Sequence, residues 1–172
     1  MIGHPLASRG GGAVPEGNDV SAKDDKETSA GIPDQLRRAA EFHTHLGPFL
    51  VVGLRMGRVV TRELGREPFT IKIQANTGRV PPYSCLVDGL QVSTPCTVGN
   101  GGLAVTDHRD MSIEAAKDGA TLTIRLRKEM WQRIESECTE ENQEEFACEI
   151  WEMPEGALLQ IARIAPSRVQ ER

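Results

Sequence analysis

The chain has few aromatic residues, few cysteines and no long apolar run. Only 4% of its 172 residues are aromatic, and four are cysteines. No two cysteines form a Cys-x-x-Cys pair, which argues against a zinc finger or a thioredoxin-type redox site. The apolar runs fall far short of the roughly 18 residues that a membrane span needs, so no membrane association is expected. Four cysteines without a recognisable secretion signal favour a reducing, cytoplasmic compartment.

A strong positive charge is missing as well. The chain has 20 Lys and Arg residues against 25 Asp and Glu residues, for a net charge of −5. Dedicated nucleic-acid binders usually carry a basic excess, so nucleic acid is not an expected partner. The charge is unevenly distributed, because residues 32–128 carry thirteen basic and nine acidic groups while residues 129–155 carry ten glutamates and Arg133 alone as a base. The positive middle of the chain favours an anionic ligand, and the acidic stretch could meet a basic partner.

The length and the 38% hydrophobic content suit one globular domain with a single core. Residues 1–31 contain six of the seventeen glycines and no aromatic residue. Such a segment buries too little apolar surface to offset the entropy of ordering it. We therefore predict a disordered tail at residues 1–31, a core domain at residues 32–165 and a frayed end at residues 166–172.

The spacing of apolar residues predicts an α+β fold, with helices packed on an antiparallel or mixed sheet. The hairpin signal Asp118-Gly119 lies between two predicted strands. Gly53 and Gly57 are four residues apart on one helix face, which favours tight packing against another element. Helices are expected at residues 33–43, 48–64, 85–92, 128–138 and 140–153, with Ser84 and Thr139 as N-caps of the third and fifth. Strands are expected at residues 68–75, 103–105, 111–117, 120–127 and 158–164.

The first stretch with chemical potential is Phe-His-Thr-His-Leu-Gly-Pro at residues 42–48. His43 and His45 lie where one predicted helix ends and the next begins, and in a turn both rings can point at one ion. Imidazole is a favoured ligand of zinc and other borderline transition metals. Ordinary packing at a helix end is the alternative interpretation of the pair.

The second stretch is Cys-Leu-Val-Asp-Gly-Leu-Gln at residues 85–91. Cys85 and Asp88 are three residues apart and share one face of the predicted helix. At a helix N-terminus the pKa of the Cys85 thiol is expected to be lowered. The alternative is a buried structural cysteine, with Asp88 forming a local cap or salt bridge.

The third stretch is Pro-Cys-Thr-Val-Gly-Asn-Gly-Gly at residues 95–102, and it contains Cys96. Its glycines could expose backbone N–H groups to a phosphate or carboxylate, which makes Thr97, Gly99, Asn100 and Gly101 candidate pocket residues. The stretch lacks the Gly-Lys-Ser/Thr ending of a P-loop, and a tight turn explains it equally well. The two other cysteines, at positions 138 and 148, are interpreted as core or interface residues.

In this order and spacing, the three stretches resemble the FmdE family, which takes its name from a component of formylmethanofuran dehydrogenase. That family shows Phe-His-Gly-His-Leu-Cys-Pro-Gly, Cys-x-x-Asp-Ala-Ile-Gln and Gly-Cys-Thr-x-Gly-Lys-Gly-Asn-Leu, and the likeness covers roughly residues 33–165. This chain departs from the pattern at Gly47, where many members have Cys, and at Asn100, which replaces a Lys. Gly101 and Gly102 replace a Gly-Asn pair. The end of the chain, residues 166–172, lacks the cysteines of a C-terminal zinc finger found in some members.

The resemblance implies an α+β core that forms an intertwined homodimer and binds a transition metal, most often zinc. Carried over by position, the implied metal ligands are His43, His45 and Cys85, with Cys96 and Asp88 close by. With Gly47 in place of a thiol, this shell keeps at least one coordination position open, which suits ligand binding better than a purely structural zinc.

Three functions are consistent with these features. The first is a metal-binding accessory factor that handles a cofactor or small molecule in one-carbon or molybdenum/tungsten enzyme metabolism. The second is a metal-dependent enzyme that acts on a small anionic molecule, with Asp88 as the nearby acid or base. The third is a non-catalytic assembly module whose glutamate-rich helices meet a basic partner.

Overall fold

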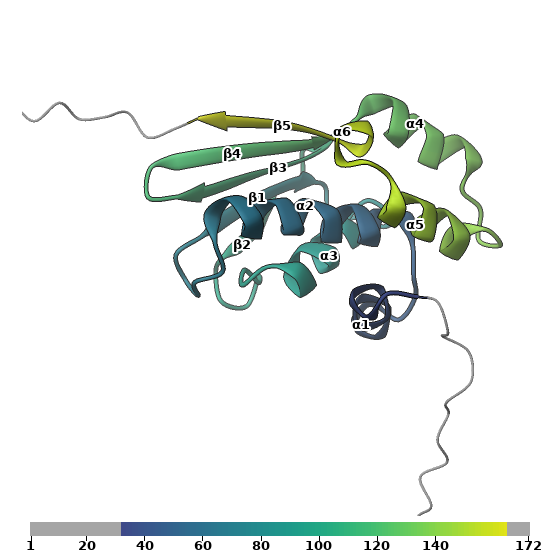
Figure 1. Cartoon of the computed structure of the whole chain (residues 1–172), viewed down its shortest axis with the longest axis horizontal. Coiled ribbons are helices and arrows are strands. Elements are labelled where there is room, and N and C mark those ends of the chain that lie inside the picture. Colours follow the sequence, from purple (N-terminus) through teal and green to yellow (C-terminus); the bar gives the residue numbers. More distant parts are fainter. Residues whose placement is uncertain (1–31, 165–172) are drawn as a thin grey trace, which may run out of the picture. The chain divides into compact units, whose positions relative to one another are not determined.

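The computed structural model describes residues 32–164 of the chain (Figure 1). The predicted tail at residues 1–31 and the predicted frayed end at residues 166–172 lie outside these residues. Within the described part the elements are, in chain order, α1 (Asp34–His43), α2 (Pro48–Leu64), β1 (Lys72–Thr77), α3 (Cys85–Ser93), β2 (Leu103–Val105), β3 (Arg109–Lys117), β4 (Ala120–Leu126), α4 (Lys128–Glu137), α5 (Gln143–Glu152), α6 (Glu155–Leu158) and β5 (Leu159–Ile164). No helix among them is long and apolar enough to cross a membrane.

The strands form one mixed sheet in the order β2-β1-β3-β4-β5. β1 and β2 are parallel, connected through α3, and the remaining neighbours are antiparallel. Alternate residues point to opposite faces of a strand, so Ile73 and Ile113 are buried under the helices while Lys72 and Glu114 are exposed on the other face. This arrangement confirms the predicted α+β fold. The Asp118-Gly119 turn joins β3 to β4, as its sequence predicts.

Helix α2 runs along the helical face of the sheet and is the centre of the core (Figure 1). Every residue from Pro48 to Gly57 is buried, because α3, the sheet and α5 surround the helix. A stripe on one face, which the sequence spacing indicates, is therefore an underestimate. Arg55 lies in this buried segment and donates hydrogen bonds to the carbonyls of Ile150 and Trp151, at 2.9 and 2.6 Å, near the end of α5. These bonds satisfy the buried guanidinium and attach α5 to α2.

The two helices α2 and α3 touch through their backbones. A Cβ atom on Gly53 would lie 2.1 Å from the Leu86 carbonyl oxygen, and one on Gly89 would lie 2.2 Å from that of Leu50. On Gly57 the added atom would lie 1.9 Å from the Ser93 Oγ. No side chain fits in such gaps. The close approach predicted from Gly53 and Gly57 is therefore confirmed, and α3 is the partner element.

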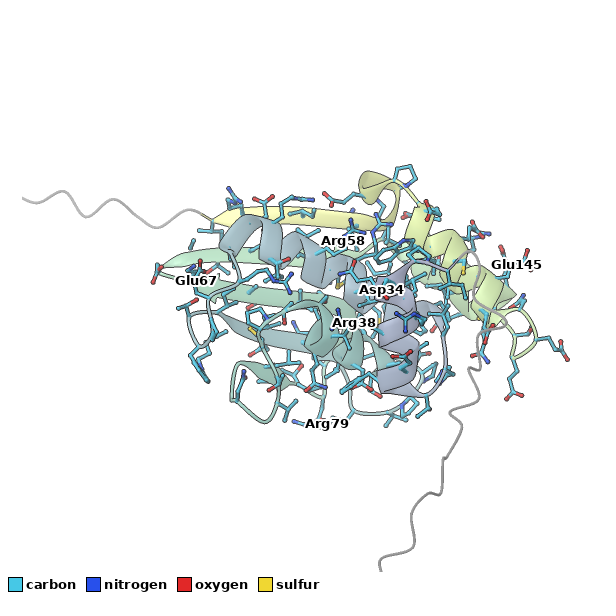
Figure 2. The ribbon with its side chains drawn as sticks, turned by 60° about the horizontal axis from the view of Figure 1, so that its bottom comes forward. Asp34, Arg38, Arg58, Glu67, Arg79 and Glu145 are labelled. Atoms are coloured by element: carbon cyan, nitrogen blue, oxygen red, sulfur yellow. The ribbon has the colours of Figure 1, made fainter. Side chains whose placement is uncertain are left out.

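The acidic stretch forms α4 and α5, which lie beyond the end of the sheet (Figure 1). Arg133 holds the two helices together, because its guanidinium pairs with Glu137 on α4 and with Glu149 on α5 and lies 4.9 Å from the Phe146 ring centre. Other glutamates point away from the protein, as Glu145 does in Figure 2. One arginine thus connects two helices that carry the same charge.

Several predicted boundaries differ from the structure. The strand expected at residues 68–75 begins only at Lys72, because residues 68–70 form a turn in which Phe69 has φ +65°. Thr139 is not an N-cap: α5 starts at Gln143, and the Asn142 side chain accepts a hydrogen bond from the Thr139 N–H at 2.7 Å. Ser84 precedes α3 as predicted, but its hydroxyl makes no capping bond. The apolar spacing does not predict the short helix α6.

Candidate metal and ligand site

The first motif forms the turn between α1 and α2. His43 ends α1, and Thr44 takes a left-handed conformation with φ +75°, which reverses the chain. Residues other than glycine rarely adopt this conformation. Gly47 is extended, and Pro48 begins α2, where its missing N–H needs no partner. The turn brings the ring centres of His43 and His45 to 4.6 Å, so both rings lie at one place, as the sequence predicts for a turn.

Asp88 on α3 fixes the orientation of His43. Its Oδ2 lies 2.7 Å from His43 Nδ1, and its Oδ1 accepts a hydrogen bond from Gln91 Nε2 at 3.1 Å. An ionised carboxylate can only accept, so the proton of the neutral imidazole is on Nδ1 and the lone pair is on Nε2. Among the described residues, the buried His43 Nε2 has no hydrogen-bond partner. An imidazole held by a carboxylate on one nitrogen and open on the other is the usual state of a metal-binding histidine.

Gln91 extends this arrangement to the third motif. Its Oε1 accepts a hydrogen bond from the Val98 N–H at 3.1 Å. The path His43–Asp88–Gln91–Val98 therefore connects all three motifs through side-chain hydrogen bonds. A change at the glycine-rich turn can reach the His43 ring through this path.

The glycine-rich turn itself does not present a cradle of free N–H groups. Asn100 Oδ1 accepts from the N–H groups of Thr97 and Gly102, at 3.0 and 2.8 Å, and its own N–H donates to Thr97 Oγ1. The N–H of Gly101 donates to the Val98 carbonyl. Because these donors are engaged within the turn, they are not available to a phosphate or carboxylate. Thr97, Gly99, Asn100 and Gly101 thus form a structural turn, contrary to the expected pocket wall.

The cysteines of the second and third motifs lie apart. Cys85 is the first residue of α3 and is partly buried beside the histidine turn. Cys96 follows the other end of α3, about 12 Å along the helix axis. It is buried in the core, with Sγ 3.5 Å from the Ile71 carbonyl oxygen. The structure therefore groups His43, His45, Cys85 and Asp88 but leaves Cys96 outside the group.

The pKa of the Cys85 thiol is raised, opposite to the direction expected for a helix N-terminus. Burial of the thiol is the larger cause, and the negative charge of Asp88 adds to it. Both effects exceed the stabilisation that the start of α3 offers a thiolate. Without a bound cation, Cys85 is a neutral thiol at neutral pH.

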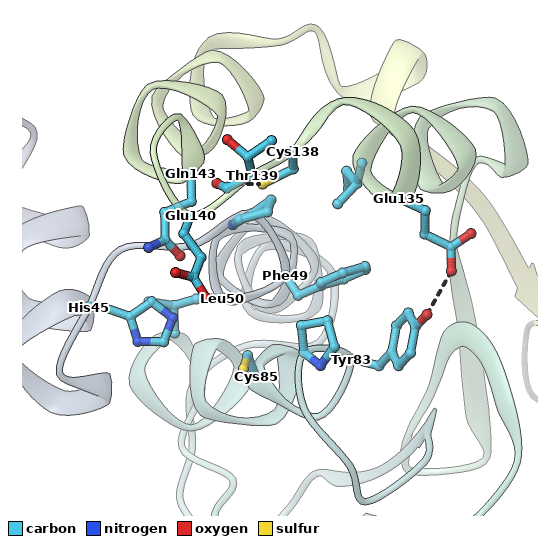
Figure 3. A pocket seen from close by; sticks show the side chains of 14 residues that line it. His45, Phe49, Leu50, Tyr83, Cys85, Glu135, Cys138, Thr139, Glu140 and Gln143 are labelled. Carbon is cyan, nitrogen blue, oxygen red and sulfur yellow. Dashed lines mark hydrogen bonds between the residues drawn. The ribbon is translucent and has the colours of Figure 1, made fainter.

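A cavity of about 600 Å³ opens beside this group (Figure 3). Its apolar surface comes from Pro48, Phe49 and Leu50 at the start of α2, together with Pro82 and Ile134. The polar groups around it are His45, Cys85, Tyr83, Glu135, Cys138, Thr139, Glu140 and Gln143. A volume of this size with a largely apolar surface and a few polar groups is typical of small-molecule sites.

The far side of the cavity consists of residues that the motifs did not indicate. Cys138, Glu135, Glu140 and Gln143 come from α4, α5 and their connection. The sequence interpretation placed Cys138 in a core or interface, whereas it lines the cavity. The signal that could have found these residues is the acidic stretch itself, because its glutamates are too many for one exposed surface alone.

Metal coordination is tested by the donors present. Among residues 32–164, no three His, Cys, Asp or Glu side chains are arranged around a common point at metal distance. The donor chemistry nevertheless fits a borderline metal, since the orphaned His43 Nε2 lies beside a second imidazole, and Cys85 lies at the start of the helix that carries Asp88. The residues present therefore match zinc in type.

The fold and the site define a small α+β domain with a histidine–thiol cavity. A family model described as "FmdE, Molybdenum formylmethanofuran dehydrogenase operon" matches residues 42–163. The chain belongs to this family, which confirms the resemblance carried by the three motifs. The match begins at the first residue of the first motif and includes α4 and α5, so both sides of the cavity lie inside the family domain.

Two known proteins are similar to the chain. The crystal structure of an FmdE-like protein of tungsten formylmethanofuran dehydrogenase from Syntrophus aciditrophicus is 20% identical, with a TM-score of 0.56 over 77% of this chain and 71% of that one. This likeness shows the fold. A probable S-adenosyl-L-methionine-binding protein from Archaeoglobus fulgidus is 40% identical over 77 residues, which are 42% of this chain. The matched part spans 20% of that relative's length.

Proposed function

We propose that this protein binds one transition-metal ion, preferably zinc, through His43, His45 and Cys85. In this proposal it is an accessory factor that handles a cofactor or small molecule, in one-carbon or molybdenum/tungsten enzyme metabolism. Membership of the FmdE family supports the metabolic link. The observation that carries the metal proposal is the His43 ring, held by Asp88 at Nδ1 and, among the described residues, unpartnered at its buried Nε2.

The energetic argument concerns the unpartnered nitrogen. A buried polar atom without a hydrogen bond destabilises a protein by about 1–3 kcal/mol. Rotating the ring to find a partner would break the 2.7 Å contact with Asp88. A bound cation at Nε2 satisfies the ring without breaking that contact, so the conformation seen here suits a metal ligand.

Asp88 has a positioning role in this proposal. Both of its oxygens are engaged, one with His43 and the other with Gln91. A free acid or base needs an oxygen that faces the substrate. The alternative function as an enzyme that uses Asp88 for proton transfer is therefore less well supported than metal binding.

The acidic helices give limited support to the alternative of an assembly module. Glu137 and Glu149 pair with Arg133 inside the chain, and Glu135 and Glu140 line the cavity. The cavity itself favours a protein that holds a small molecule. We propose a homodimer as well, following the family resemblance, and a monomeric mass at micromolar concentration in solution would refute it.

Metal analysis of the purified full-length chain tests the main proposal. The wild type is expected to hold about one metal ion per chain, because three donors of two kinds suit a single site. His43→Ala and Cys85→Ser should each lose most of that metal. The matched controls are His108→Ala, on an exposed loop, and Cys148→Ser, outside the cavity, and both should keep it.

Two results would contradict the proposal. The first is a metal-free wild type that takes up no zinc, nickel or cobalt when these are added. The second is metal that remains in His43→Ala and Cys85→Ser at the level of the controls. Circular dichroism of each variant separates loss of the site from loss of the fold.

A further inference from the structure

The charge around the cavity differs from that of the chain segment that holds the motifs. Residues 32–128 carry a basic excess, yet no Lys or Arg of the described residues lines the cavity. Its charged side chains are the carboxylates of Glu135 and Glu140, both from the acidic stretch. The electrostatic potential inside the cavity therefore follows α4 and its connection to α5 and not the basic segment.

Within residues 32–164, neither carboxylate is neutralised by a neighbouring cation. Glu140 has no hydrogen bond or ion pair among the described residues. Glu135 accepts one hydrogen bond, from the Tyr83 hydroxyl at 2.7 Å. That bond raises the pKa of Tyr83, and burial adds to it, so the carboxylate keeps its negative charge and the phenol its proton. Two unpaired negative charges at an apolar cavity attract a positively charged ligand.

The carboxylates lie on opposite sides of the cavity. Figure 3 shows Glu140 and Gln143 on the side of His45, and Glu135 with Tyr83 on the other side. The buried Phe49 ring lies between them and packs edge-on against Tyr83, with 5.2 Å between ring centres. A ligand that fills this space meets an apolar surface along its body and a carboxylate at each end.

We propose that the cavity binds a small organic cation with an apolar or aromatic body, such as a sulfonium or ammonium compound. An anionic ligand, expected from the basic segment, would be repelled by Glu135 and Glu140. The inference rests on the proposed ligand-handling function, but it does not depend on the metal. The relative from Archaeoglobus fulgidus carries S-adenosyl-L-methionine, a sulfonium compound, in its name.

A matched pair of probes isolates the positive charge. S-adenosyl-L-methionine has a sulfonium, and S-adenosyl-L-homocysteine has a neutral thioether in its place. Isothermal titration calorimetry of the full-length chain should show the sulfonium compound binding about fivefold more tightly, since exposed carboxylates contribute modestly to binding a cation. The ratio should fall towards one in Glu140→Gln and Glu135→Gln. The control Glu144→Gln, on α5 outside the cavity, should keep the ratio.

The same titration on metal-free His43→Ala separates this inference from the metal proposal. Preference for the cation should persist there, because the carboxylates remain. Equal affinity for both probes, tighter binding of the neutral probe, or no binding of either would overturn the inference. Loss of metal together with a retained preference would refute only the metal proposal.

Discussion

The two sides of the cavity are held in place by different forces. On the side of the motifs, α2 and α3 meet backbone to backbone at Gly53 and Gly89, inside a fully buried core. On the acidic side, α4 and α5 are joined by Arg133, whose ion pairs with Glu137 and Glu149 are largely exposed. Close packing is insensitive to salt, whereas exposed ion pairs are weakened by it.

This difference suggests a division of roles. The motif side orients His43 through Asp88 and Gln91, as a metal ligand requires. The acidic side brings two carboxylates to the cavity on helices that can adjust to a ligand. Pre-organisation matters most where bond directions are strict, and adaptability matters where charge attracts over a distance.

The largest effect is expected from Gly53→Ala. Alanine favours a helix by about 1 kcal/mol over glycine, yet its Cβ would lie 2.1 Å from the Leu86 carbonyl oxygen. The clash with a backbone atom outweighs the gain, and we expect the free energy of unfolding to fall by about 3 kcal/mol. Urea denaturation measures it. Gly99→Ala is the control, because its nearest neighbour would be 3.9 Å away, and it should change stability by less than about 0.5 kcal/mol.

The next effect concerns metal affinity. Asp88→Asn keeps the shape of the side chain but removes the charge that holds His43 Nδ1–H. Loss of such a supporting group typically weakens metal binding by about 10- to 100-fold. Competition with a chromophoric chelator gives the dissociation constant for zinc. Asp107→Asn, on an exposed loop, should bind zinc like the wild type. Unchanged affinity in Asp88→Asn would show that the motif side does not act through this contact.

A smaller loss of stability is expected on the acidic side. Arg133→Gln removes ion pairs with Glu137 and Glu149 that solvent screens, so the loss should be about 1 kcal/mol or less. The difference between variant and wild type should shrink in high salt. Thermal unfolding at two salt concentrations measures both quantities, with the exposed Arg38→Gln as the matched control (Figure 2). A loss as large as that of Gly53→Ala would remove the contrast between the two sides.

The smallest effect is a titration. Tyr83 is the only tyrosine of the chain, so the ultraviolet absorbance of tyrosinate reports on it alone. Its pKa should lie above the ordinary value of about 10, because Glu135 accepts its proton and burial disfavours the charge. Glu135→Gln should lower the pKa towards that value. The bond stabilises the fold below pH about 10, and this contribution is lost as the pH rises through the raised pKa.

Much of the fold could be predicted from the sequence because its signals are local. Apolar spacing identified α2, and Asp118-Gly119 identified the hairpin between β3 and β4. The boundaries that failed depend on single contacts. Asn142 orders the turn before α5 in place of Thr139, and the turn at Phe69 delays β1. No spacing rule contains that information.

The site could be predicted only on one side. Motif spacing grouped His43, His45 and Cys85, but it placed Cys96 with them, since sequence distance does not show that α3 separates the two cysteines. Cys138 and Glu140 reach the cavity through tertiary packing about 50 residues further along the chain. The raised pKa of Cys85 likewise follows from burial, which the helix position alone does not reveal.

Cobalt binding tests the central claim most directly. Co²⁺ is a common substitute for zinc, and a thiolate bound to it gives a charge-transfer absorption in the near ultraviolet. Titrating the metal-free chain with Co²⁺ should produce this band with an endpoint of about one ion per chain, as for a single site. The band should disappear in Cys85→Ser and persist in Cys148→Ser. No band in the wild type, or an unchanged band in Cys85→Ser, would contradict a metal site built on His43, His45 and Cys85.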